Sequence, residues 1–316
     1  MKQIPQVKDL RNILILRAFD SVSKAVVSSC VYREMKRVNP SLQITVACFH
    51  HPYDYLQHNP YIDSVIRLPH GGIGLWSKAF QLRAKHFDLV LDTSDRAATD
   101  WKWFKRFVGG LRLLDRDTSP VQPFGAPDKH AAVHEQAVLK LLGVPDPDGS
   151  YELTIPSTTR QKTEDWLASQ HLSSYILLNS GGTSKDRQFR PNVLYKIACI
   201  CKQWGYPFVL TVPSEEANRW QPIFQEMPEV RIKIADDQFE RFELVRRATF
   251  IITPDTSAVS IADAFQKPLL IFYNHLTSYN APDNPKAYIL ETDPANINQF
   301  DWDKFTALVE KIKPTL

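Results

Sequence analysis

Short, fully apolar runs alternate with helical segments along most of this 316-residue chain. Runs without polar alternation are typical of strands buried on both faces, as in a parallel sheet covered by helices. The expected strands lie at residues 13–16, 42–49, 64–68, 87–92 and 111–114 in the first half, and at 175–179, 208–212, 230–234, 249–252 and 269–272 in the second. The pattern predicts an α/β fold with two doubly wound parallel sheets.

The helices expected between these strands complete two similar halves. They lie at residues 21–38, 75–85, 97–108, 131–142, 192–203, 215–225 and 241–247, then from about 257, and finally at 301–312. We expect two Rossmann-like domains facing across a cleft, at residues 1–160 and 161–300, followed by a C-terminal helix at 301–316. Their connection is expected at about 150–170, after a proline-rich surface loop at 120–128.

The composition is that of an ordinary globular protein, with 43% hydrophobic and 23% charged residues. The formal net charge of +3 does not indicate a nucleic-acid partner. The cysteines lack metal-binding spacing and are expected to be reduced packing residues: Cys30, Cys48, Cys199 and Cys201. Residues 1–11 are largely polar and the next apolar run is too short to span a bilayer, so we expect no signal peptide and a cytoplasmic location.

A turn in the second half has the features of an anion site. The apolar run 249–252 ends at Pro254, and Asp255, Thr256 and Ser257 are residue types that favour a helix N-terminus. A helix that starts there presents backbone N–H groups and the positive end of its dipole at the carboxyl edge of a sheet, which suits a phosphate. An ordinary capped strand–helix unit remains the alternative.

A second candidate anion site follows the strand at 175–179. Gly181 and Gly182 would let the backbone approach a phosphate, and the cations Lys185, Arg187 and Arg190 follow them. The segment is not a P-loop, because the spacing of the glycines and the lysine differs. Arg187 is the first choice for a diphosphate contact; solvated loop charges are the alternative.

These segments, in this order, resemble the lipopolysaccharide heptosyltransferase family, glycosyltransferase family 9. Asp255 and Thr256 match the family's Asp-Thr/Ser-Gly, whereas Ser257 replaces its glycine and Ser260 its histidine. Arg187-Gln188-Phe189 stands where the family has Lys-x-Trp. The resemblance implies a GT-B fold, in which the terminal helix often packs back on the first domain. The donor-binding residues are then Thr183, Lys185, Arg187, Arg190, Asp255, Thr256, Ser257 and Ser260.

The same resemblance assigns roles in the first half. Asp20, after the first strand, corresponds to the family's proposed catalytic base, with Phe19 in place of a glycine; a helix cap is the alternative. The segment at 101–108 combines tryptophan, phenylalanine and cations, which suits an acidic sugar or anionic lipid, although a core-packing helix is the alternative. The residues expected to bind the acceptor are Asp92, Lys102, Lys105 and Arg106.

The implied activity is transfer of a sugar with inversion, most simply heptose from ADP-heptose, onto the lipopolysaccharide inner core. The partners are a nucleotide-diphosphate sugar, a lipid A/Kdo-type or core-oligosaccharide acceptor, and peripherally the inner membrane. No metal or other cofactor is expected, since no metal-ligand cluster is visible. Two alternatives remain open: another nucleotide sugar as donor, or a sugar-nucleotide-binding protein without turnover.

Overall fold

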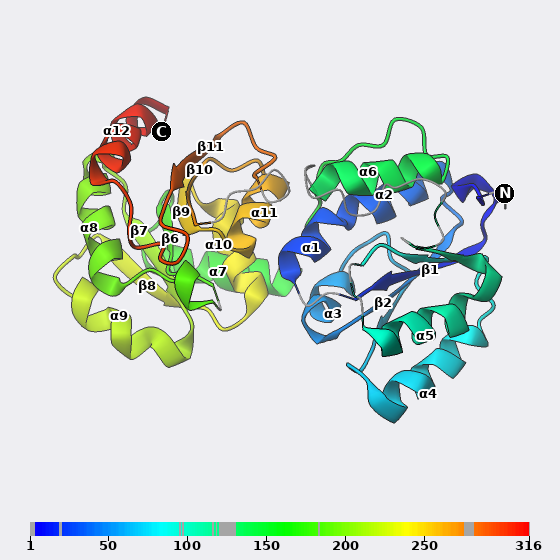
Figure 1. Cartoon of the computed structure of the whole chain (residues 1–316). Helices are drawn as coiled ribbons and strands as arrows, with labels where there is room; N and C mark the ends of the chain where they lie inside the picture. Colours follow the sequence, from blue (N-terminus) through cyan, green and yellow to red (C-terminus); the bar gives the residue numbers. More distant parts are fainter. Residues whose placement is uncertain are drawn as a thin grey trace. The chain divides into compact units, whose positions relative to one another are not determined.

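The computed structural model of the chain describes residues 4–18, 21–94, 96, 98–115, 117, 119, 131–182, 184–274 and 281–315. The chain divides between Thr154 and Ile155 into two compact units, close to the boundary expected at residue 160. Each unit is built around one parallel sheet with helices (Figure 1).

The sheet of unit 1 has five parallel strands in the order β3-β2-β1-β4-β5. The strands are β1 Asn12–Arg17, β2 Gln43–Cys48, β3 Ser64–Arg67, β4 Leu89–Asp92 and β5 Leu113–Leu114. Strand order reverses beside β1, which pairs with β2 on one side and β4 on the other. In doubly wound sheets ligands bind at the carboxyl edge beside such a reversal.

The helices of unit 1 differ from expectation at two points. They are α1 Val22–Val27, α2 Ser29–Val38, α3 His50–Leu56, α4 Gly72–Arg83, α5 Thr99–Gly109 and α6 Ala131–Leu141. The expected single helix 21–38 is interrupted at Ser28, whose hydroxyl donates to the Ala25 carbonyl. Helix α3 occupies a stretch expected to be turns, because Pro52 falls in its first turn, where a missing N–H leaves no helical bond unmade.

The sheet of unit 2 has six parallel strands in the order β11-β10-β9-β6-β7-β8. The strands are β6 Ile176–Asn179, β7 Phe208–Val212, β8 Val230–Ile234, β9 Phe250–Pro254, β10 Leu269–Tyr273 and β11 Ala287–Glu291. The edge strand β11 was not predicted, because only one of its residues is fully buried. Strand order reverses beside β6, which pairs with β7 and β9.

The helices of unit 2 include one that the sequence pattern did not predict. They are α7 Ser157–Ser169, α8 Pro191–Cys201, α9 Ala217–Phe224, α10 Gln238–Arg247, α11 Ser257–Ala264 and α12 Trp302–Ile312. Helix α7 lies where only a connection was expected, because its amphipathic pattern is weak. Short 3-10 helices complete the fold: Val7–Asp9, Gly110–Arg112, Lys185–Arg187, Lys202–Trp204, Ser214–Glu216 and Lys313–Thr315.

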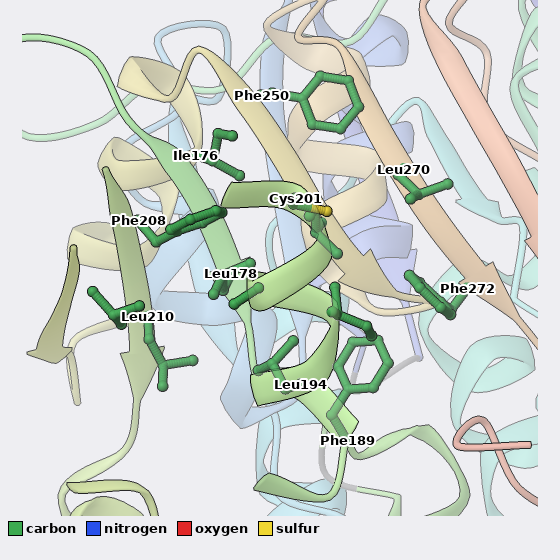
Figure 2. Packing of buried hydrophobic residues seen from close by; sticks show 14 of the residues in the cluster. Ile176, Leu178, Phe189, Leu194, Cys201, Phe208, Leu210, Phe250, Leu270 and Phe272 are labelled. Carbon is green, nitrogen blue, oxygen red and sulfur yellow. The ribbon is translucent and has the colours of Figure 1, made fainter. Parts of the chain in front are cut away.

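Helix α12 belongs to the core of unit 2. Its residues Phe305, Val309 and Ile312 are fully buried in the same cluster as the side chains of β6, β7, β9 and β10. Figure 2 shows part of that cluster, including Phe189 and Phe272, whose rings meet edge-on at 5.0 Å. The apolar face of α12 is therefore buried within its own unit, and the expected packing of this helix on the first domain stays a prediction.

Candidate functional site

Two loops lie at the carboxyl edge of the unit 2 sheet, beside the point where strand order reverses. One is the glycine loop, residues 180–190, between β6 and α8; the other is the turn of residues 254–257, between β9 and α11. Asn179, at the end of β6, joins them: its amide donates to Thr253 Oγ1 at 2.9 Å and to Thr256 Oγ1 at 3.0 Å. The two candidate anion sites therefore lie together.

Thr256 caps the N-terminus of α11. Its backbone is extended, and its Oγ1 accepts the N–H of Ala258 at 3.3 Å. Gly182 lies directly against this cap, since a Cβ on Gly182 would come within 3.2 Å of Thr256 Cγ2. The glycine therefore brings the loop backbone close to the positive end of the helix dipole.

Gly181 lets the loop backbone turn back sharply on itself. Its φ is +144°, and an added Cβ would lie 2.7 Å from the Arg187 carbonyl oxygen and from Gln188 Cα. The loop closes there through a bridge between Gly181 and Gln188 and a bond from the Gly182 N–H to the Arg187 carbonyl. Only glycine fits this backbone without a rearrangement of the loop.

The far end of the glycine loop is anchored in the core. Phe189 is completely buried; its N–H donates to the Ser180 carbonyl at 2.9 Å, and its ring meets Phe272 edge-on at 5.0 Å. Asn298 accepts the Arg190 N–H at 2.7 Å and donates to the Gln188 carbonyl at 3.0 Å. The cations of the loop therefore extend from a backbone held at both ends.

Arg187 is the loop cation that is ion-paired beside the start of α11. Its Nη1 lies 3.3 Å from Asp255 Oδ2, and its Nε lies 3.9 Å from Asp186 Oδ2. Asp186 accepts hydrogen bonds from Ser184 and from Asn274, the latter at 2.7 Å, and these bonds lower its pKa. The arrangement holds one guanidinium between two carboxylates at the edge of the helix N-terminus.

The remaining expected donor-site residues lie nearby or cannot be placed. Ser257 and Ser260 are half-exposed on the first turn of α11, and Lys185 and Arg190 are exposed on the glycine loop. Thr183 and the expected base Asp20 both lie outside the described residues.

In unit 1, Asp92 ends β4 as a buried carboxylate. It accepts hydrogen bonds from Trp101 Nε1 at 3.0 Å and from the Ser94 N–H at 3.0 Å. Burial raises its pKa, although these bonds and Lys105 oppose the rise. This surrounding is typical of a structural acid, the alternative already considered for Asp92.

Lys105 is buried with Asp92, unlike the other cations of α5. Its Nζ lies 3.4 Å from Asp92 Oδ2 and 2.6 Å from Asp115 Oδ2. Burial would lower its pKa, but the two carboxylates raise it above the usual value. Lys102 and Arg106 are exposed, so only these two of the three α5 cations can meet a ligand in this conformation.

Arg17 is a buried cation at the end of β1 to which sequence reasoning assigned no role. It forms an ion pair with Glu135 at 3.0 Å and donates to the Tyr32 hydroxyl at 3.1 Å and to Thr93. Burial opposes its charge, yet Glu135 and Tyr32 hold its pKa above the usual value. Its position directly after the apolar run at residues 13–16 is the sequence feature that could have indicated this buried cation.

The described ranges hold neither a metal-binding cluster nor a membrane-spanning helix. They contain no group of three or more histidine, cysteine, aspartate or glutamate residues placed to hold a metal. None of the helices assigned there combines the length and the apolar character needed to cross a bilayer.

Comparison with known proteins gives matches in structure but none in sequence: no family model and no curated protein matches. The glycosyltransferase family 9 protein of Veillonella parvula superposes with a TM-score of 0.81 at 15% identity, covering 100% of this chain and 99% of that one. Escherichia coli ADP-heptose LPS heptosyltransferase II gives 0.66 at 16%, covering 95% and 99%. The chain has the fold of the family 9 glycosyltransferases.

The family 9 fold confirms the expected α/β class with two Rossmann-like units. Escherichia coli heptosyltransferase WaaC with ADP-2-deoxy-2-fluoro heptose also shares it, with a TM-score of 0.70 at 14% identity over 95% of this chain and 99% of that one. So does the UDP-GlcNAc 2-epimerase of Methanocaldococcus jannaschii, at 0.54 and 10% over 96% and 92%. Because one fold carries different reactions, the activity has to be argued from the site.

Proposed function

We propose that the protein is an inverting glycosyltransferase whose nucleoside diphosphate sugar binds at the carboxyl edge of the unit 2 sheet. One observation carries the proposal: the backbone at Gly182 packs against the capped N-terminus of α11, with Arg187 beside it. Close backbone, a helix dipole and a guanidinium are the three elements that bind a diphosphate. The family 9 fold supports the same location.

In this proposal the donor site stabilises the leaving group. The α11 end at Thr256 and Ser257, together with Arg187, meets the diphosphate as its negative charge grows, and Lys185, Arg190 and Thr183 add contacts around it. Asp255 accepts hydrogen bonds from sugar hydroxyls, and Ser260 lies one turn into α11 on the same side as Ser257. No metal is required, because the helix end and the cations already balance the negative charge of the diphosphate.

The acceptor hydroxyl supplies the nucleophile. Its oxygen attacks the anomeric carbon from the face opposite the diphosphate, and the bond from that carbon to the phosphate oxygen breaks with its electron pair leaving on the nucleoside diphosphate. Asp20 takes the hydroxyl proton as general base. One displacement of this kind inverts the anomeric configuration.

The finer assignment is heptose from ADP-heptose as donor and the lipopolysaccharide inner core as acceptor. It is supported by the family 9 motifs and by structural likeness to the Escherichia coli heptosyltransferases. Lys102 and Arg106, exposed on α5, would contact the acidic groups of a lipid A/Kdo-type acceptor, and the buried Asp92 and Lys105 would hold α5 in place.

The test is a panel of ADP-, UDP- and GDP-sugars in a thermal-unfolding assay, followed by transfer with the sugar that stabilises the protein most. A ligand that binds only the folded state raises the melting temperature, and ADP-heptose is expected to give the largest rise. Asp20→Ala is expected to abolish transfer and to retain donor binding. Binding without transfer by the unaltered protein would favour the non-catalytic alternative, and no binding by any sugar would overturn the proposal.

A further inference from the structure

Exposed apolar side chains gather on α4 and α5 of unit 1. Seven large apolar residues are exposed among those described, and four lie on these two helices: Ile73 at 91%, Phe80 at 63%, Trp103 at 60% and Trp76 at 37%. The other three are scattered over α6, α9 and β8. The helices pack side by side (Figure 1). Single exposed apolar residues are ordinary, but a cluster marks an interaction surface.

Helix α4 is apolar on two sides. Ile73, Trp76 and Phe80 have the spacing of one helical side. Its other side carries the buried residues Leu75, Ala79 and Leu82. A helix with apolar residues on both sides is usually covered on both. Here the core covers one side, and the second side remains exposed.

Phe107 of α5 joins the two helices into one surface. Its ring lies edge-on to Phe80 at 4.9 Å and to Trp76 at 5.9 Å, and the guanidinium of Arg83 lies over it at 4.8 Å. We define the aromatic face as Ile73, Trp76, Phe80, Trp103 and Phe107.

The charge on the two helices of the aromatic face is almost entirely positive. The cations that are not buried on the two helices are Lys78, Arg83, Lys102 and Arg106. Asp100, in the first turn of α5, is the only acid on either helix. Exposed aromatic and aliphatic side chains on helices that also carry cations match the boundary between lipid headgroups and acyl chains, where the surface is anionic.

We propose that the aromatic face binds the surface of an anionic lipid bilayer. Ile73, Phe80 and Trp103 enter the headgroup region, and Lys102 and Arg106 contact lipid phosphates. A second copy of the chain is disfavoured, because joining two such faces would bring cations opposite cations. The proposal deepens the proposed function, whose acceptor is a lipid, but binding to vesicles needs neither donor nor acceptor.

The experiment is co-sedimentation of the full chain with vesicles of phosphatidylcholine alone or with about one third phosphatidylglycerol. Binding is expected only with the anionic lipid and is expected to weaken with salt. Ile73→Ser/Phe80→Ser should weaken it roughly tenfold or more. Lys102→Gln/Arg106→Gln should weaken it about fivefold for each cation removed. The matched control Ile223→Ser/Ile234→Ser, on exposed apolar positions of unit 2, should bind like the unaltered protein.

Several outcomes would overturn the inference. Failure of the unaltered chain to bind anionic vesicles would do so, as would equal loss of binding in the control. Sedimentation velocity distinguishes a second copy: a dimer that Ile73→Ser/Phe80→Ser converts to a monomer, without vesicle binding, would assign the face to self-association. Thermal stabilisation by the sugar nucleotide is measured on the same variant. Its retention separates a failure here from a failure of the proposed function.

Discussion

Arg187 Nη1 lies 3.3 Å from Asp255 Oδ2, so the glycine loop and the start of α11 are joined by an ion pair. Within the described part of the chain, Arg187 Nε has no hydrogen-bond partner. A diphosphate that displaced Asp255 from this guanidinium would come to lie against the N-terminus of α11. The pair thus defines where a leaving group would be held and which two residues would respond to it.

Arg187→Gln is expected to weaken ADP binding by about 10- to 100-fold, because it removes a charge-assisted hydrogen bond worth about 1.5–3 kcal/mol. Isothermal titration calorimetry measures the change. Arg160→Gln, at an exposed position on α7, is the matched control and should bind ADP normally. Equal affinity of the Arg187 variant and the control would remove Arg187 from the donor site.

Asp255→Asn is expected to change the affinities for ADP and for a nucleotide sugar by different amounts. Loss of its negative charge releases Arg187, so ADP should bind several-fold more tightly. A nucleotide sugar should gain less or lose affinity, because the carboxylate no longer accepts hydrogen bonds from sugar hydroxyls. The ratio of the two dissociation constants is the readout, and an unchanged ratio would exclude a sugar contact at Asp255.

Gly181→Ala is expected to destabilise unit 2 by about 2–4 kcal/mol and to impair ADP binding, because its positive φ and its crowded Cβ position both oppose a side chain. Gly205→Ala is the comparison: its φ is also positive, at +78°, but no atom lies within 4 Å of the added Cβ. That variant should lose only about 1 kcal/mol. Denaturant unfolding measures the loss in free energy of unfolding for both variants. Equal losses would contradict the crowded backbone at Gly181.

Lys105→Met is expected to lower the free energy of unfolding by about 3 kcal/mol, because it leaves Asp92 and Asp115 as buried carboxylates without their cation. Lys102→Met, on the exposed side of the same helix, should change stability by less than about 0.5 kcal/mol. Urea unfolding monitored by circular dichroism measures both. A stable Lys105 variant with impaired acceptor use would instead assign Lys105 to the acceptor.

Asp263→Asn is expected to stabilise the protein above neutral pH. Burial raises the pKa of Asp263 to about 7. Because the folded state binds the proton more tightly than the unfolded chain, stability falls as the pH rises from about 4 to 7 and stays low above it. The variant should gain about 2–4 kcal/mol at pH 8 and little at pH 4. Unfolding free energies at both pH values test this, and an equal effect at both would be contrary to it.

The strand runs, the two parallel sheets and the positions of the glycine loop and the α11 turn could all be predicted from local pattern. Apolar runs define buried strands, and residues 181–182 and 255–257 carry their conformational preferences wherever they occur. The main elements missed were α3, α7 and β11. Their patterns are weak, and tertiary packing stabilises them more than their own sequence does.

The partners of buried charges could not be predicted, because they come from distant parts of the chain. Lys105 lies four residues after the buried Trp101, which places it on the same side of α5. Its burial nevertheless depends on Asp92 and Asp115, which the fold brings next to it. Arg17 meets Glu135 from α6. Local sequence therefore specified which segments become strands and helices, and where the glycine loop and the turn before α11 lie. Packing of remote segments determined which charges are buried in pairs and which, like Lys102, stay exposed. The reason is that a charged side chain can lose its water only where the fold places an opposite charge beside it.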